Sequence, residues 1–192
     1  MARSYLERSD LVPQLAEIFR RYGYEGASIG VIAQETGAGR SSLYHFFPGG
    51  KEEMADAVLA QISDWFEVHI FAPLRERPAP QALVEMAAAV ETYFRSGQRI
   101  CLVGAFALDD VRSRFSGRIE SYFARWGAAL AECLQRAGWP EPEARQEAIS
   151  ILAAIQGGIV LTRASGNAEA FRSALATALA RAGRAGTDAT GE

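Results

Sequence analysis

Cysteine and histidine are scarce in this sequence, with two of each in 192 residues. Cys101 and Cys133 are too few and too far apart for a disulfide framework, and no Cys-x-x-Cys pair suggests a zinc site. The sequence also lacks a Ser/His/Asp or Cys/His arrangement, a phosphate-binding loop and a pair of acids set in a patterned pocket. We therefore expect a protein that is not an enzyme, with no catalytic residue, no metal and no cofactor.

Long apolar runs are missing as well. The N-terminal stretch MARSYLERSD is charged throughout, and no uninterrupted run reaches the ~18 apolar residues that cross a bilayer. Together with the low cysteine content, this pattern favours a reducing compartment. We expect a soluble, cytoplasmic protein without a membrane partner.

An excess of positive charge, typical of proteins that bind nucleic acid along their whole surface, is also absent. The formal net charge is −3, and residues 1–51 carry six basic and five acidic side chains. Any nucleic-acid contact must therefore depend on where individual side chains are placed.

The sequence does contain helical periodicity along most of its length. From about residue 4 to residue 22, apolar residues recur at three- and four-residue spacing, and Gly23-Tyr24-Glu25-Gly26 ends that run. Pro13 lies inside it, so either the helix begins near Asp10 with Pro13 in its first turn, or the helix bends there. The first helix is thus predicted, and its start is left open.

Residues 28–51, SIGVIAQETGAGRSSLYHFFPGGK, predict two short helices joined by a tight turn. Ser28 is a candidate N-cap for a helix that ends near Thr36, and the turn is Gly37-Ala38-Gly39. In the second helix, Leu43 and Phe47 at i and i+4 face inward, and Pro48-Gly49-Gly50 ends it. Its polar side chains remain available on the outside.

The remainder is helical in pattern too, without strand alternation or a fixed repeat. We expect helices at about 51–71, 83–94, 111–137, 144–164 and 168–182, a compact apolar segment at 101–108, and a loop at 73–80. The sequence therefore predicts an all-α fold. We assign residues 1–52 to a small N-terminal domain, residues 53–184 to a larger helical domain and residues 185–192 to a disordered tail.

Within residues 28–51, the order of motifs resembles the helix-turn-helix of TetR-family transcriptional regulators. The run Leu43-Tyr44-His45-Phe46-Phe47-Pro48 followed by Lys51-Glu52-Glu53 is in register with that family, although the Pro-Gly-Gly-Lys exit is one residue longer than the commoner form. This exit, the segment 101–108, and Gln156-Gly157-Gly158 with Arg163-Ala164 are similar to the LmrA/YxaF-like branch.

The resemblance implies a three-helix DNA-binding domain in which the second short helix enters the major groove. Arg40 is then the candidate base reader, since a guanidinium can bond guanine in bidentate fashion. The other candidate DNA contacts, to phosphate or to base edges, are Ser28, Ser41, Ser42, Tyr44, His45 and Lys51. Without the resemblance, Tyr44 and His45 are simply exposed polar aromatics, and Ser28 is only a cap.

The same resemblance implies a small-molecule effector held in the larger domain, although ordinary core packing also explains most of its aromatic residues. The candidate pocket residues are Trp65, Phe66, Phe94, Cys101, Phe106, Phe123, Trp126 and Gln156. Cys101 is interpreted either as a small buried apolar residue or as a sensor of electrophiles.

Small residues crowd the surfaces of the last two helices, which predicts a homodimer through a four-helix interface. The resemblance thus implies a homodimeric repressor that binds a palindromic DNA operator and is released by an effector. The alternative is a helical small-molecule-binding protein or enzyme with a non-functional helix-turn-helix.

Overall fold

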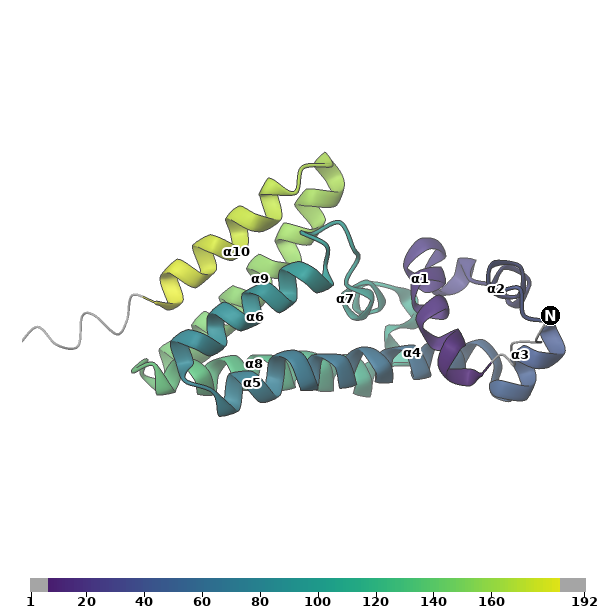
Figure 1. Ribbon diagram of the computed structural model, residues 1–192, viewed down its shortest axis with the longest axis horizontal. Helices are drawn as coiled ribbons and strands as arrows, with labels where there is room; N and C mark the ends of the chain where they lie inside the picture. Colours follow the sequence, from purple (N-terminus) through teal and green to yellow (C-terminus); the bar gives the residue numbers. More distant parts are fainter. Residues whose placement is uncertain (1–6, 184–192) are drawn as a thin grey trace, which may run out of the picture. The chain divides into compact units, whose positions relative to one another are not determined.

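The computed structural model describes residues 7–183, and every regular element in that range is helical (Figure 1). The predicted all-α fold is therefore confirmed for these residues, and the tail at 185–192 lies outside them. The elements in chain order are α1 (Arg8–Gly26), α2 (Ile29–Thr36), α3 (Arg40–Phe46), α4 (Gly50–Phe66), a π-helix (Glu67–Phe71), α5 (Ala72–Glu76), α6 (Ala79–Tyr93), α7 (Leu102–Ala107), a 3-10 helix (Asp110–Ser113), α8 (Ser116–Arg136), α9 (Glu141–Ser165) and α10 (Glu169–Ala182).

The described chain divides into two compact units. The smaller unit contains residues 7–64 and 102–119, and the larger contains residues 65–101 and 120–183. Helices α4 and α8 each contribute residues to both units. The grouping of α7 with the N-terminal helices depends on contacts between distant parts of the chain, which the sequence pattern did not anticipate.

Helix α1 begins at Arg8, where Asp10 accepts a hydrogen bond from the Glu7 backbone N–H at 3.0 Å. This start places Pro13 in the second turn, with its ring exposed to solvent. The last turns are interrupted at Gly23, which has a φ of 68° and a ψ of 177°. The predicted stop at residues 23–26 is thus a kink within the helical segment.

Two predicted boundaries were wrong. Helix α4 continues through the π-helix into α5, so Pro73 lies in a helix and only Arg77 and Pro78 separate α5 from α6. Pro73 directly follows the π-helix, where the Ala72 N–H donates to the Glu67 oxygen five residues back, so the regular i to i−4 hydrogen-bond pattern is already altered at the point where proline lacks a donor. The helix expected from about residue 111 begins at Ser116, because Asp109 caps a 3-10 turn by accepting from the Val111 N–H at 3.2 Å.

The core of the larger unit is aromatic. The ring of Phe66 lies 5.0 Å from that of Tyr122 and 5.1 Å from that of Trp126, and all three side chains are buried. Helices α9 and α10 lie side by side (Figure 1), and Gly158 of α9 makes close contact with Phe171 of α10. The small residues predicted on these helices therefore permit the two backbones to approach each other.

Helix α9 carries large apolar side chains on the surface of this unit. Its length and composition alone would allow it to cross a membrane, and only about a third of its most apolar stretch is buried. Three of its large apolar side chains are about 60% exposed: Ile149 at 61%, Val160 at 63% and Leu161 at 59%. Such a continuous exposed apolar face normally marks an interaction surface.

Candidate nucleic-acid interface

The two helices of the predicted helix-turn-helix are built by local contacts. The Ser28 hydroxyl accepts a hydrogen bond from the Val31 N–H at 3.2 Å, so the predicted N-cap of α2 is confirmed. The Thr36 hydroxyl accepts from the Ala38 N–H at 3.2 Å, and Gly37 ends α2 in the left-handed conformation with a φ of 68°. That φ suits glycine because a β-carbon would crowd the backbone. The turn therefore fixes where α3 begins.

Helix α3 has one buried side and one exposed side. Leu43 and Phe47 are completely buried, which confirms that both face inward. The side chains on the opposite side all lie exposed: Arg40, Ser41, Ser42, Tyr44 and His45. Tyr44 is 48% exposed, a large fraction for an aromatic ring, and the ring of Phe46 stacks edge-on against His45 at 5.3 Å. Hydroxyl, imidazole and guanidinium groups thus share one accessible surface.

Arg40 lies beside the start of the neighbouring helix. A methyl group on Gly30 would be 3.5 Å from the Arg40 guanidinium and 3.7 Å from the Ser28 hydroxyl. A positive side chain and the N-terminus of α2 therefore meet at one point on the surface. Helix N-termini carry partial positive charge and unpaired N–H groups, so this point is suited to an anionic backbone such as that of DNA.

Lys51, the seventh predicted DNA contact, has intramolecular partners. Its ammonium donates to the Tyr24 backbone oxygen at 3.0 Å, lies 3.5 Å from the Glu25 carboxylate and sits 4.1 Å above the Tyr24 ring. Its side chain is 21% exposed. Lys51 thus joins the start of α4 to the end of α1, a role that its position in the sequence motif does not reveal.

Glu53 and Arg8 hold the turn between α3 and α4, and the sequence did not indicate either role. The Gly49 N–H donates to the Glu53 carboxylate at 2.8 Å, and the Arg8 guanidinium lies 3.5 Å from the same carboxylate. The Arg8 guanidinium also stacks over the buried ring of Phe47 at 4.8 Å. The motif Lys51-Glu52-Glu53 gave no indication of these contacts. The pairing of Glu53 with Gly49 and Arg8 helps to hold α3 in place.

The smaller unit is completed by an aromatic cluster that includes α7. Phe106 lies 6.1 Å from Phe19, 5.9 Å from Tyr24 and 5.4 Å from Phe115, measured between ring centroids. Burial raises the pKa of the Tyr24 hydroxyl, although the nearby Arg114 opposes that shift. Phe106 was expected to line the effector pocket of the larger unit. In the structure it packs in the smaller unit against Phe19 and Tyr24 of α1, the helix that precedes the helix-turn-helix.

Ion pairs connect α4 to residues 114–118 within this unit. The Arg118 guanidinium makes a two-pronged contact with the Asp56 carboxylate, with Nη2 2.6 Å from Oδ2. Arg114 lies 3.5 Å from Glu52. The hydrogen bond from Arg118 lowers the pKa of Asp56. No sequence signal indicated these pairs, because their members are more than sixty positions apart.

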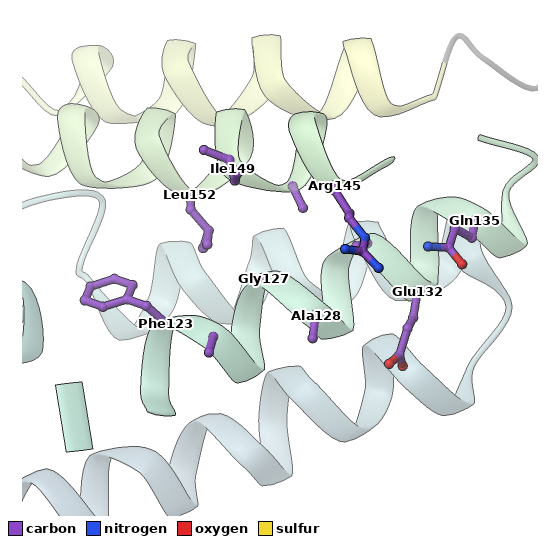
Figure 2. Close-up of a pocket in the computed structure, with 11 residues that line it drawn as sticks. Phe123, Gly127, Ala128, Glu132, Gln135, Arg145, Ile149 and Leu152 are labelled. Atoms are coloured by element: carbon purple, nitrogen blue, oxygen red, sulfur yellow. The ribbon is translucent and has the colours of Figure 1, made fainter. Parts of the chain in front are cut away.

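The other candidate pocket residues belong to the larger unit. Phe66, Phe94 and Trp126 are completely buried, and Cys101 is 5% exposed. Trp65 contacts Phe66 at 5.3 Å, whereas Phe123 lines a groove between α8 and α9 (Figure 2). Among the described residues, the indole N–H of Trp126 and the amide nitrogen of Gln156 are buried without a hydrogen-bond partner.

The two cysteines are buried, and they form no disulfide. Burial raises the pKa of the Cys133 thiol, whose sulfur lies 3.7 Å from the Ala79 carbonyl oxygen. The proposal that Cys101 senses electrophiles stays a hypothesis. Within residues 7–183 no group of three His, Cys, Asp or Glu side chains is placed to hold a metal ion.

Comparison with known protein families gives two matches that together cover most of the chain. Residues 14–58 match the model of bacterial regulatory proteins of the tetR family. Residues 79–188, more than half of the chain, match the C-terminal domain of LmrA/YxaF-like transcriptional regulators.

Individual proteins agree with these matches. The sequence is 28% identical over 160 residues to the HTH-type transcriptional regulator YxaF of Bacillus subtilis, covering 81% of this chain and 84% of that protein. It is 25% identical over 171 residues to the regulator LmrA of the same organism, covering 83% and 88%.

Solved structures share the fold. The crystal structure of a TetR transcriptional regulator from Legionella pneumophila superposes with a TM-score of 0.79 at 19% identity, covering 92% of this chain and 97% of that one. A TetR regulator from Chloroflexus aurantiacus gives 0.78 at 20% identity, covering 92% and 94%. The chain therefore belongs to the TetR family of non-enzymatic, DNA-binding transcriptional regulators, with an N-terminal helix-turn-helix and an LmrA/YxaF-like C-terminal domain.

Proposed function

We propose that this regulator is a cytoplasmic repressor that binds a palindromic operator as a homodimer and leaves it when a small molecule binds the larger unit. The observation that carries the proposal is the two-sided structure of α3. Leu43 and Phe47 anchor the helix completely, so its exposed side is presented in a fixed orientation. A fixed helix with exposed hydrogen-bonding side chains is what reading the major groove requires.

The roles of the exposed residues follow from their chemistry. Arg40 reads a guanine, because its planar fork can bond two acceptors of one base. Ser41 and Ser42 contact base edges or phosphate, and Tyr44, His45 and Ser28 contact phosphates. The Lys51 ammonium has three N–H groups, some of which are used by the Tyr24 oxygen and the Glu25 carboxylate. An N–H group that these partners do not use can donate to a phosphate.

Dimerisation is supported by the exposed face of α9. Ile149, Ala153, Gly157 and Val160 are all exposed, and they follow one another at three- and four-residue spacing. No charged side chain interrupts the run from Ala148 to Thr162. A stripe of this kind is stable when a second copy covers it. Few phosphates are neutralised by one α3, so two copies are also needed for useful affinity.

An effector is supported by the interior of the larger unit. Trp126 and Gln156 each hold a buried donor without a partner, an arrangement that costs free energy until an acceptor is supplied. A small molecule with acceptor groups would satisfy these donors. For release, such a molecule must bind the DNA-incompetent state more tightly than the DNA-bound state. Helix α4, which contributes to both units, is the element whose position we expect it to bias.

The test uses DNA fragments from upstream of the gene, with binding followed by fluorescence anisotropy at several salt concentrations. We expect specific, salt-dependent binding, and Arg40→Ala should relax the preference at one position of each half-site by ~1–3 kcal/mol. Arg21→Ala is the matched control, because it removes an exposed arginine from α1 that is paired with Glu35 at 3.6 Å.

Two results would contradict the proposal. If wild type binds no fragment specifically at moderate salt, the alternative of a ligand-binding protein with a non-functional helix-turn-helix gains support. If Arg40→Ala weakens all sequences equally and lowers the salt slope of the dimer by about 1.8, about 0.9 for each of its two copies, Arg40 contacts a phosphate and does not read a base.

A further inference from the structure

Gly30 is the second residue of α2, and its backbone conformation does not require a glycine. It lies inside a regular helix and is not among the glycines with a positive φ. Glycine is less favourable inside a helix than any residue except proline, because it has the most backbone freedom to lose. The backbone of α2 thus gives no reason for a glycine at position 30.

The surroundings of Gly30 consist of candidate DNA contacts. Apart from the backbone of α2 and the chain neighbours, a β-carbon on Gly30 would meet two atoms within 4 Å, namely Nη2 of Arg40 at 3.5 Å and Oγ of Ser28 at 3.7 Å. Arg40 is the first residue of α3, so its side chain reaches back across the turn to the start of α2. A side chain at position 30 would therefore occupy the space beside the guanidinium.

No polar partner fixes the Arg40 guanidinium in this place. Arg40 is exposed, and its guanidinium forms no hydrogen bond or ion pair with the described residues. Arg8 and Arg21 of the same unit differ, because they lie 3.5 Å and 3.6 Å from carboxylates. The location of the Arg40 guanidinium thus depends on the room that its neighbours leave. A side chain longer than a methyl group at position 30 would compete for that room.

We propose that Gly30 is a positioning residue for DNA recognition. Because Gly30 has no side chain, the Arg40 guanidinium can lie against the start of α2, and this location determines which base pair of a half-site Arg40 reaches. The inference rests on the proposed function, in which Arg40 reads a base, and it adds the residue that sets where Arg40 reads. A bidentate contact requires the planar fork to face both acceptors of one base, so displacement of the fork removes the preference.

The size of the side chain at position 30 provides the test. Gly30→Leu and Gly30→Ala are compared with wild type on the upstream fragment that wild type binds and on single-base-pair substitutions of that fragment, by competition fluorescence anisotropy. We expect Gly30→Leu to lower the preference at one position of each half-site by about tenfold, the size expected for one bidentate base contact. Gly30→Ala should lose less, because its methyl group would only touch the guanidinium at 3.5 Å.

Gly117→Leu is the matched control. Gly117 is an exposed helical residue of α8 in the same unit, and a β-carbon there would meet nothing within 4 Å. The variant adds the same side chain to a helix outside the helix-turn-helix, so its base preference should equal that of wild type. Urea unfolding shows whether the variants fold, and both leucine variants should be at least as stable as wild type, because leucine favours a helix more than glycine does.

A double variant separates positioning of Arg40 from a direct effect of the leucine. If Gly30 acts through Arg40, Gly30→Leu combined with Arg40→Ala should keep the base preference of Arg40→Ala alone, within about twofold. A purely structural role of Gly30 would not produce such coupling at one base position. If Gly30→Leu lowers affinity by the same factor in both backgrounds, the leucine disturbs the DNA or α2 directly, and the inference is overturned.

The single variants distinguish failure of this inference from failure of the proposed function. If Arg40→Ala relaxes the preference at one position while Gly30→Leu behaves like Gly117→Leu, Arg40 reads a base but Gly30 does not position it. The inference then fails by itself. If Arg40→Ala has no effect specific to one position, the base-reading role in the proposed function fails, and this inference fails with it.

Discussion

Gly97, in the connection between α6 and α7, lies so close to other residues that a larger side chain there should destabilise the fold. Arg95, Ser96 and Gly97 have consecutive positive φ values of 51°, 51° and 85°. A β-carbon on Gly97 would lie 2.7 Å from Cβ of Phe171 and 2.8 Å from Oγ1 of Thr162. These two residues stand at the start of α10 and near the end of α9, so Gly97→Ala must push against the corner that joins the two helices.

Two effects set the magnitude for Gly97→Ala. A left-handed backbone costs a residue with a β-carbon ~1–2 kcal/mol. Overpacking of a close-packed site costs a further ~1–3 kcal/mol, partly offset by the ~0.4–1 kcal/mol gained because alanine restricts the unfolded chain. The corner has little freedom to move, because the Thr162 hydroxyl accepts from the Phe171 N–H at 3.2 Å and Arg163 donates to the Gln98 carbonyl oxygen at 2.8 Å. We expect a loss of about 2–4 kcal/mol in unfolding free energy.

Urea unfolding at one fixed protein concentration measures this loss, since the stability of a dimer depends on concentration. Gly138→Ala is the control, because Gly138 has a φ of 93° but a β-carbon there would meet nothing within 4 Å. Its loss should therefore contain only the backbone effect, ~1 kcal/mol. If the two variants lose the same amount, the close packing of Gly97 against the corner does not contribute to stability, and the reasoning is refuted.

Two further predictions concern the smaller unit. Lys51→Met should lower the unfolding free energy by ~2 kcal/mol, because it removes a charged hydrogen bond to the Tyr24 carbonyl oxygen and a cation–π contact. Unchanged stability in urea, with a DNA-binding salt slope of the dimer lower by about 1.8, would show instead that Lys51 serves mainly as a phosphate contact. Asp56→Asn should cost only ~0.2–1 kcal/mol at neutral pH, because the pair with Arg118 is well exposed. Since that pairing lowers the pKa of Asp56, its contribution is present above the ordinary carboxylate pKa and disappears as the pH falls through the lowered value, so the two proteins should converge in acid. A difference that stays constant down to strongly acidic pH would contradict this assignment.

The position of Lys51 bears on how the DNA-binding surface is maintained. Its contacts to Tyr24 and Glu25 tie the start of α4 to the end of α1, while Glu53 and Arg8 close the turn after α3. Residues at the start of α4 therefore help to hold α1 and the turn after α3 in place. In the effector-released repressor proposed above, a movement of α4 would disturb these contacts and so lower operator affinity.

The sequence by itself determined the helix-turn-helix and the family. The cap at Ser28, the left-handed turn at Gly37 and the buried pair Leu43 and Phe47 are contacts between residues at most four positions apart, so spacing and residue type predict them. The exposed candidates on α3 follow from the same periodicity. Their individual roles on DNA remain predictions, because no sequence pattern distinguishes a base contact from a phosphate contact.

Only the tertiary structure decided which distant residues meet. Phe106 contacts Phe19 and Tyr24 across more than eighty positions, and Asp56 pairs with Arg118 across sixty-two. Helical periodicity identifies the buried face of each helix but not the helix that covers it, because a similar apolar stripe can pack against many partners. For this reason the surroundings of the candidate effector residues and the intramolecular contacts of Lys51 could not be predicted from the sequence, since they depend on packing between elements that are far apart in the chain.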